Sequence, residues 1–283
     1  MTDRYKVYAY TEIIRPVNCL MMVLAVYAAS VVGERTLTVP DSKLLAGFVT
    51  AFMLTGFAMV VNDIFDLKTD FLNEPSRPIP SGRLTIGEAR SYAFFLAASG
   101  VAFAAYDGWI TLALASLSVV ISYAYSFKLK LGGLLGNLAV SYNVGLPFLY
   151  GGLITSGLRP VLAVFFILAF LSNTGREIVK GIAETEGDRL RGAQTVAIRY
   201  GEKAASIAAS LFSLVAVALS PLPVIVGGIS LSGYLPPITV TDVLFVYLAV
   251  KLLASSGNAS SVKREYKFPM LLAILSFITG ALF

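Results

Sequence analysis

The sequence contains no histidine and only one cysteine, Cys19. The commonest general base and the commonest transition-metal ligand are therefore missing, and one cysteine can form neither a disulfide nor a thiolate metal site within a chain. Neither a Walker-type phosphate loop nor a Rossmann glycine fingerprint is present, which disfavours binding of ATP or a dinucleotide. Any chemistry must rest on carboxylates, Lys, Arg, Tyr, Ser, Thr or Asn.

Charge is also scarce, and long apolar segments take its place. Charged residues make up 14% of the 283 residues and hydrophobic residues 57%, whereas soluble domains contain about 25% and 45–50%. A helix needs roughly 20 apolar residues to cross a membrane. We therefore predict an all-α polytopic membrane protein, a single domain over residues 1–283, with about nine spans at 16–33, 44–62, 91–107, 109–126, 134–154, 161–179, 204–228, 236–254 and 268–283.

The basic residues orient these spans. If the N-terminus is cytoplasmic, all of the 22 basic residues except Arg35, Lys43 and Arg159 fall on the cytoplasmic side. This distribution follows the positive-inside rule and predicts an integral protein of the cell membrane with a cytoplasmic N-terminus. The net charge of +5 then reflects topology, so no nucleic-acid partner is expected, and no obligate protein partner is evident.

Two acidic segments stand at predicted cytoplasmic ends of spans. In the first, "NDIFDLKTD" at 62–70, Asp63, Asp66 and Asp70 fall within about 60° of one another if the helix continues. In the second, at 172–195, Glu177, Glu184 and Asp188 are spaced to share one face of a continuous helix, with Asn173 nearby. The two segments resemble each other, which suggests an internal repeat of regions 44–107 and 161–228.

Solvated loop charges are the simplest interpretation of any one of these acids. Like charges on one helical face repel, however, unless a cation lies among them. Hard oxygen donors without His or Cys suit Mg²⁺, which substrate phosphates usually help to coordinate. Basic residues that suit phosphate oxygens stand at predicted cytoplasmic helix ends near the acidic segments, at Arg77, Lys128, Lys130, Arg176 and Lys180. These residue types together predict a site for Mg²⁺ and a lipid-soluble diphosphate.

The first acidic segment matches the NDxxDxxxD motif of the UbiA superfamily of intramembrane prenyltransferases, and the segments "YSFKLK" and "GAQTVAIRYG" are also similar to that family. The resemblance implies a prenyl diphosphate donor, a lipid-soluble acceptor in the membrane, and a central cavity open to the cytoplasmic side. It implies metal ligation and catalysis by Asp63, Asp66, Asp70, Glu184 and Asp188, with Glu177 as a further candidate ligand. Expected substrate contacts are Asn18, Asn62, Arg77, Tyr125, Lys128, Lys130, Asn173, Arg176 and Lys180.

One position departs from the family pattern. The second motif commonly reads DxxDxxxD, and the corresponding residues here are Gly181, Glu184 and Asp188. The leading acid is missing, so the metal on that side either rests on Glu184 and Asp188 or is bound more weakly.

Within the family, "RPVNCL", "RPIPSG" and "GREIVKGI" look most like an archaeal branch. That branch is expected to transfer a geranylgeranyl group from its diphosphate to the hydroxyl of geranylgeranylglyceryl phosphate, which forms the second ether bond of archaeal membrane lipid. Arg15, Arg83 and Arg176 are candidates to hold the acceptor phosphate. Prenylation of an aromatic quinone precursor is the nearest alternative, and transport of a divalent cation or phosphate is a more distant one.

Overall fold

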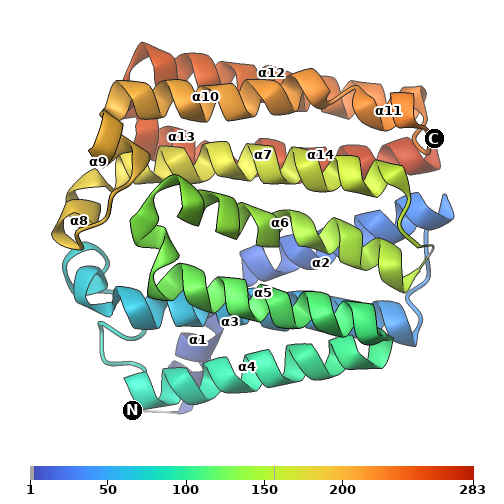
Figure 1. Ribbon diagram of the computed structural model, residues 1–283. Helices are drawn as coiled ribbons and strands as arrows, with labels where there is room; N and C mark the ends of the chain where they lie inside the picture. Colours follow the sequence, from blue (N-terminus) through green and yellow to red (C-terminus); the bar gives the residue numbers. More distant parts are fainter. Residues whose placement is uncertain (1–2, 156) are drawn as a thin grey trace. The chain divides into compact units, whose positions relative to one another are not determined.

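The computed structural model describes residues 3–155 and 157–283, and these residues form helices joined by short turns (Figure 1). The predicted all-α class is confirmed. The α-helices are α1 (Asp3–Ile13), α2 (Pro16–Glu34), α3 (Ser42–Asn73), α4 (Ile86–Asp107), α5 (Trp109–Phe127), α6 (Leu134–Ile154), α7 (Pro160–Ala183), α8 (Thr185–Leu190), α9 (Val196–Tyr200), α10 (Glu202–Leu219), α11 (Leu222–Val226), α12 (Leu231–Ala254), α13 (Ala259–Glu265) and α14 (Lys267–Leu282).

Among the described residues, seven helical segments are long and apolar enough to cross a membrane. They are Pro16–Glu34, Ser42–Phe71, Trp109–Phe127, Pro160–Ala183, Glu202–Val226, Leu231–Ala254 and Ser256–Leu282. The chain is therefore an integral membrane protein. The other two predicted spans form α4 and α6, which are not among these seven segments. The total of nine spans stays a prediction.

The chain divides into two compact units, and the division leaves the predicted single domain and internal repeat untested. The first unit comprises Met1–Leu24 and Pro40–Leu129. In it α3, α4 and α5 pack against one another (Figure 1), and Cys19 lies fully buried in a core shared with Phe57 and Leu96. A capping box of Thr85 and Glu88 begins α4, and Lys6 of α1 pairs with Glu88 at 2.5 Å.

The second unit comprises Ala25–Val39 and Lys130–Phe283. Helix α7 packs against α6 and α10, and α12 packs against α10 and α14 (Figure 1). The predicted span 204–228 is divided into α10 and α11 at Ser220 and Pro221, because proline lacks the N–H that would continue the hydrogen bonding of α10. A buried cluster that includes Ile178, Val262 and Tyr266 joins α7 to the segment that follows α12.

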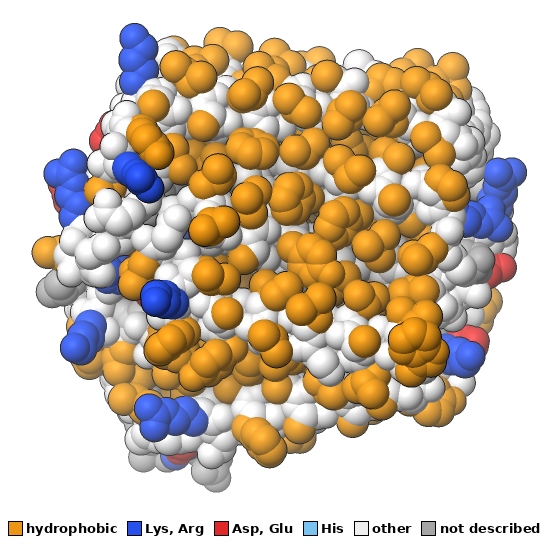
Figure 2. All heavy atoms as spheres, viewed as in Figure 1, with side chains coloured by type: hydrophobic (Ala, Val, Ile, Leu, Met, Phe, Trp, Pro, Cys, Tyr) orange, Lys and Arg blue, Asp and Glu red, His pale blue; other side chains and the backbone are white. Residues whose placement is uncertain are grey.

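The surface agrees with a membrane environment. Figure 2 shows hydrophobic side chains covering the middle of the helices on one face, with Lys and Arg side chains gathered towards the helix ends. Large apolar side chains such as Phe94, Val120 and Val243 are 76%, 62% and 62% exposed. Soluble monomers rarely expose apolar surface on this scale, whereas lipid favours it.

Candidate functional site

The first acidic segment lies on one unbroken helix. Helix α3 runs from Ser42 to Asn73, so it continues through Asp63, Asp66 and Asp70. The prediction that these three residues share one helix is confirmed. Their side chains are buried, with exposed fractions of 2%, 7% and 6%. Buried carboxylates must be paired or hydrogen-bonded, so the partners of these three acids decide what the segment can do.

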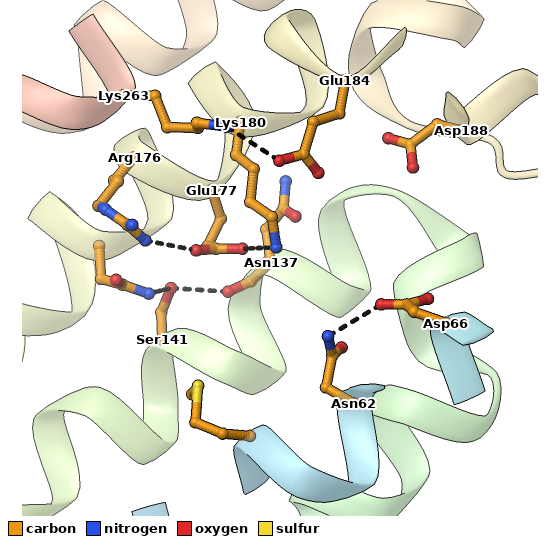
Figure 3. A network of polar contacts seen from close by, with 12 residues as sticks. Asn62, Asp66, Asn137, Ser141, Arg176, Glu177, Lys180, Glu184, Asp188 and Lys263 are labelled. Carbon is orange, nitrogen blue, oxygen red and sulfur yellow. Dashed lines mark hydrogen bonds and ion pairs between the residues drawn. The ribbon is translucent and has the colours of Figure 1, made fainter. Parts of the chain in front are cut away.

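Two arginines and one amide supply the partners within the first unit. Arg77 Nη1 lies 2.6 Å from Asp70 Oδ2 and 3.6 Å from Asp63 Oδ1. Arg15 Nη2 donates to Asp63 Oδ1, and Asn62 Nδ2 donates to Asp66 Oδ2 at 2.8 Å. Figure 3 shows the bond between Asn62 and Asp66. The cations therefore lie among the three carboxylates, where they offset the repulsion between like charges.

Arg77 remains a cation in these surroundings. Burial acts to lower the pKa of Arg77, but the neighbouring carboxylates of Asp63 and Asp70 more than offset it, and the pKa is raised above its ordinary value. Arg15 has a φ of 53°, a left-handed conformation that costs a non-glycine residue of order 1 kcal/mol. The contact with Asp63 helps to hold this conformation, which joins α1 to α2.

The remaining candidates of the first unit differ in their surroundings. Asn18 Nδ2 contacts Met59 Sδ at 3.7 Å, which places it beside the turn of α3 that precedes Asp63. Arg83 is bound to both carboxylate oxygens of Glu12 and to the carbonyl oxygen of Ser76. It therefore fastens the loop after α3 to α1, and its predicted contact with the acceptor phosphate stays a prediction.

The candidates Tyr125, Lys128 and Lys130 lie at and just after the end of α5. Tyr125 is half-buried near the end of α5, and Lys128 is exposed at its C-cap. Lys130 follows in the short 3₁₀ helix Leu129–Gly132, at the start of the second unit. The substrate contacts predicted for these three residues stay predictions.

The second acidic segment departs from the predicted geometry. Helix α7 ends at Ala183, Glu184 is its C-cap, and Asp188 lies in the separate helix α8. The prediction that Glu177, Glu184 and Asp188 share one face of a continuous helix is therefore wrong. Thr185 ends the helix, because its hydroxyl donates to the carbonyl oxygens of Gly181 and Ile182, both at 2.9 Å, and takes the place of backbone donors.

Lysines and arginines pair with the acids of this segment, as they do in the first unit (Figure 3). Arg176 Nη1 donates to Glu177 Oε1 at 2.9 Å, and Lys180 Nζ lies 3.6 Å from Glu177 Oε2. Arg191 Nη2 donates to Asp188 Oδ1 at 3.1 Å. The Nε of Arg176 is buried and has no hydrogen-bond partner within residues 3–155 and 157–283, so Arg176 keeps one unused donor.

Glu184 is paired with a residue that the sequence did not single out. Lys263 Nζ of α13 donates to Glu184 Oε1 at 3.1 Å (Figure 3). Burial acts to raise the pKa of Glu184, but Lys180 and Lys263, with Arg191, lower the pKa below its ordinary value. Glu184 therefore stays ionised. The basic pair Lys263 and Arg264 was visible in the sequence, but no local pattern connects it to an acid 79 positions away.

Asn173 belongs to a buried polar chain between two helices. Its Nδ2 donates to Ser141 Oγ at 3.0 Å, and Ser141 donates to the carbonyl oxygen of Asn137 at 2.6 Å. These bonds fasten α7 to α6 one turn before Arg176 and Glu177. Asn173 therefore has a structural role, and its predicted substrate contact stays a prediction.

The donors suit a magnesium ion in type, although they are not gathered around one point. Across the described part of the chain, no three His, Cys, Asp or Glu side chains converge closely enough to hold a metal ion. The acids present only oxygen donors, they lie on or beside long helices, and a cation of the protein lies close to almost every one. Oxygen donors of this kind fit Mg²⁺, provided that the arginines and lysines release them when a metal ion binds.

Comparison with known proteins identifies the family. Residues 19–275 match the UbiA prenyltransferase family. The chain belongs to this family. It is 38% identical over 275 residues to the digeranylgeranylglyceryl phosphate synthase of Methanopyrus kandleri, a match that covers 97% of this chain and 99% of the relative. The synthase of the same name from Methanocaldococcus jannaschii is 33% identical over 279 residues, with 98% and 97% covered.

Solved structures of UbiA family members have the same fold. A structure of a digeranylgeranylglyceryl phosphate synthase matches 98% of both chains with a TM-score of 0.79 and 32% identity. A UbiA homologue from Archaeoglobus fulgidus, bound to GPP and Mg²⁺, matches 95% of this chain and 98% of its own with a TM-score of 0.68. At 17% identity, the second comparison bears on the fold alone.

Proposed function

We propose that this UbiA family member transfers a geranylgeranyl group from geranylgeranyl diphosphate to the hydroxyl of geranylgeranylglyceryl phosphate, with Mg²⁺ as cofactor. The product carries the second ether bond of archaeal membrane lipid, and diphosphate is released. The observation that carries this proposal is the near full-length similarity to synthases of that name at 30–38% identity. The names of these relatives favour a glyceryl phosphate acceptor over an aromatic acceptor, and an enzyme over a transporter.

Magnesium would be held by Asp63, Asp66, Asp70, Glu184 and Asp188, with Glu177 as a further candidate. When bound, it would neutralise the negative charge that grows on the leaving diphosphate. The proposal is supported by the chemistry of these donors, by the burial of the three aspartates on α3 and by the position of Glu184 at the C-cap of α7. It is further supported by the fold shared with a homologue that binds GPP and Mg²⁺.

The basic residues would bind the phosphate oxygens. Arg77 is suited to this role because a guanidinium stays charged in proteins and can change partners from carboxylate to phosphate. Arg176 has an unused Nε donor beside its bond to Glu177, and Lys128, Lys130 and Lys180 add point charges. These contacts would hold the diphosphate while it is part of the donor and after its bond to the prenyl carbon has broken.

The reaction itself exchanges one carbon–oxygen bond for another. The bond between the allylic carbon and the diphosphate oxygen breaks, and the bonding pair leaves with the diphosphate. The acceptor hydroxyl oxygen forms the new bond to that carbon and loses its proton, which a carboxylate of the acidic segments or the released diphosphate can accept. The role of the protein is to align the two lipids and to keep water from the reactive carbon.

We further propose that the acidic segments and the N-terminus lie on the cytoplasmic side and that α4 and α6 also cross the membrane. The distribution of the 22 basic residues supports this orientation. Both helices are long enough to cross, with 22 and 21 residues.

The first test is a product assay. Purified protein in detergent is incubated with Mg²⁺, geranylgeranyl diphosphate and one of three acceptors: geranylgeranylglyceryl phosphate, hydroxybenzoate or dihydroxynaphthoate. Mass spectrometry then identifies the product. An ether-linked digeranylgeranyl product is expected, and a prenylated aromatic alone would reject the proposed acceptor.

Substitution of the acids tests the metal site. Asp63→Asn and Asp66→Asn should each lower kcat by roughly 10²–10³-fold, because an amide cannot supply the charge that a metal ligand needs. Asp41→Asn is the matched control: Asp41 caps the opposite end of the same helix, and Asn caps a helix equally well, so full activity is expected. Activity retained in both Asp63→Asn and Asp66→Asn would remove the metal role.

A further inference from the structure

Helix α13 holds its side chains in a defined position against α7. Val262 and Tyr266 are 0% and 1% exposed, and they pack in the cluster that contains Ile178 and Ile182 of α7. The Tyr266 hydroxyl lies 2.7 Å from Ser213 Oγ of α10. Lys263 follows Val262 directly, so the packing of α13 aims this lysine at the end of α7.

The ion pair that Lys263 forms is partly exposed to solvent. Its Nζ lies 3.1 Å from Glu184 Oε1, and the two side chains are 29% and 33% exposed. A pair as exposed as this contributes little to stability. Packing of Val262 and Tyr266 already fastens α13, so the pair is not needed to hold the helix, and either partner can exchange its contact at small cost.

Within the described part of the chain, Glu184 is the acid that pairs with Lys263. One turn before Glu184 stands Gly181, where the family motif has an acid. A Cβ built on Gly181 would lie 3.5 Å from Thr195 Cβ, so this position faces the loop before α9. Glu177 and Asp188 are already paired with Arg176 and Arg191, and Glu186 is exposed on α8. A ligand that takes Glu184 therefore leaves Lys263 available to bind another anion.

We propose that Lys263 is a further diphosphate-binding residue, which passes from Glu184 to an oxygen of the donor diphosphate when a metal ion takes Glu184. This inference rests on the proposed function. The exchange keeps each charge paired at every stage, because the carboxylate passes from ammonium to metal while the ammonium passes from carboxylate to phosphate.

The exchange predicts effects of opposite sign on two ligands. Without Lys263, a metal ion no longer competes with an ammonium for Glu184, so the metal alone should bind more tightly. The donor diphosphate loses one charged contact, so it should bind more weakly. A substitution that merely disordered the end of α7 would weaken the binding of both ligands.

The experiment compares Lys263→Met, Lys263→Arg and the control Lys251→Met in detergent-purified protein. Lys251 forms a similar exposed pair with Glu265 at 2.7 Å and has no contact in the proposed site. Binding of Mn²⁺ alone is measured by electron paramagnetic resonance. Binding of geranylgeranyl diphosphate with Mg²⁺ and without acceptor is measured by calorimetry.

For Lys263→Met we expect Mn²⁺ to bind about fivefold more tightly and the donor about tenfold more weakly. Lys263→Arg should retain donor binding, and Lys251→Met should change neither. Glu184→Gln provides a second variant: without any divalent metal, it should bind the diphosphate more tightly than the wild type, because Lys263 has lost its partner. Parallel weakening of both ligands in Lys263→Met, or no change in either, would overturn the proposal.

The two proposals can fail separately. If the protein shows these binding effects but makes no ether-linked product, the assignment of Lys263 holds and the proposed acceptor is wrong. If the ether-linked product forms and Lys263→Met binds both ligands like the wild type, the proposed function holds and Lys263 is not a diphosphate contact.

Discussion

Two glycines of α7 should respond to alanine substitution in different ways. A Cβ on Gly175 would lie 2.8 Å from Ser213 Oγ and 2.9 Å from the carbonyl oxygen of Ala209 in α10. Both distances are below what real Cβ atoms adopt, and a backbone carbonyl cannot move without its helix. A Cβ on Gly181 would meet only Thr195, at an ordinary contact distance of 3.5 Å.

The magnitudes follow from two opposing effects. Alanine favours a helix over glycine by up to about 1 kcal/mol, a gain that applies to both positions. Overpacking of a well-packed interior costs about 1–3 kcal/mol, and this cost applies to Gly175 alone. Gly175→Ala should therefore be less stable than Gly181→Ala by about 1–3 kcal/mol, and Gly181→Ala should equal or slightly exceed the wild type.

The assay is reversible unfolding of the detergent-solubilised protein by a denaturing detergent, followed by far-ultraviolet circular dichroism. The comparison of the two variants removes the helix-propensity gain, so it isolates the contact between α7 and α10. Equal stability of the two variants, or a less stable Gly181→Ala, would refute the close approach of these helices at Gly175.

Two further predictions concern the ion pair of α1 and the buried hydroxyl pair. The hydrogen bond from Lys6, with the capping of Thr85, lowers the pKa of Glu88 from 4.5 to about 2. Its contribution to stability is complete above pH 4.5 and is lost as the pH falls through about 2, so the difference in thermal midpoint between wild type and Lys6→Met should shrink over that interval. Tyr266→Phe should cost about 1 kcal/mol, because Ser213 can still donate to the carbonyl of Ala209 at 3.1 Å. Ser213→Ala leaves a buried phenol without that partner and should cost about 1–3 kcal/mol in the same unfolding assay; the reverse order would contradict the hydrogen-bond assignment.

Local sequence patterns predicted the features that depend on neighbouring residues, namely the long helices and the residues that share one helix. The apolar segments predicted most of the long helices to within about five residues, but α3 continues to Asn73 and the predicted span 204–228 is divided into α10 and α11. The spacing of Asp63, Asp66 and Asp70 predicted their common helix. Helix α3 continues past the acids because Ile64 and Leu67 pack against the core of the first unit. The same spacing argument failed for Asp188, because spacing alone carries no information on where a helix ends.

Contacts between distant parts of the chain were beyond the sequence. The pairing of Arg15 with Asp63 joins residues 48 positions apart, and that of Lys263 with Glu184 joins residues 79 apart. Charge alone would allow each of these acids many partners. The packing of the helices, such as the burial of Val262 beside Lys263, decides which partner each acid has. No pattern within one segment of the sequence predicts that packing.

The buried position of Cys19 has a practical consequence for chemical labelling. Its side chain is 0% exposed, and the thiol donates to the carbonyl oxygen of Ile14 at 3.2 Å, so thiol reagents cannot reach it in the folded protein. An added cysteine would then be the one reactive thiol, without removal of the native one. A cysteine can be placed at exposed Arg35 in one variant and at exposed Lys203 in another. Each variant is then treated in intact cells with a thiol reagent that does not cross membranes, and modification shows that the loop lies outside the cell.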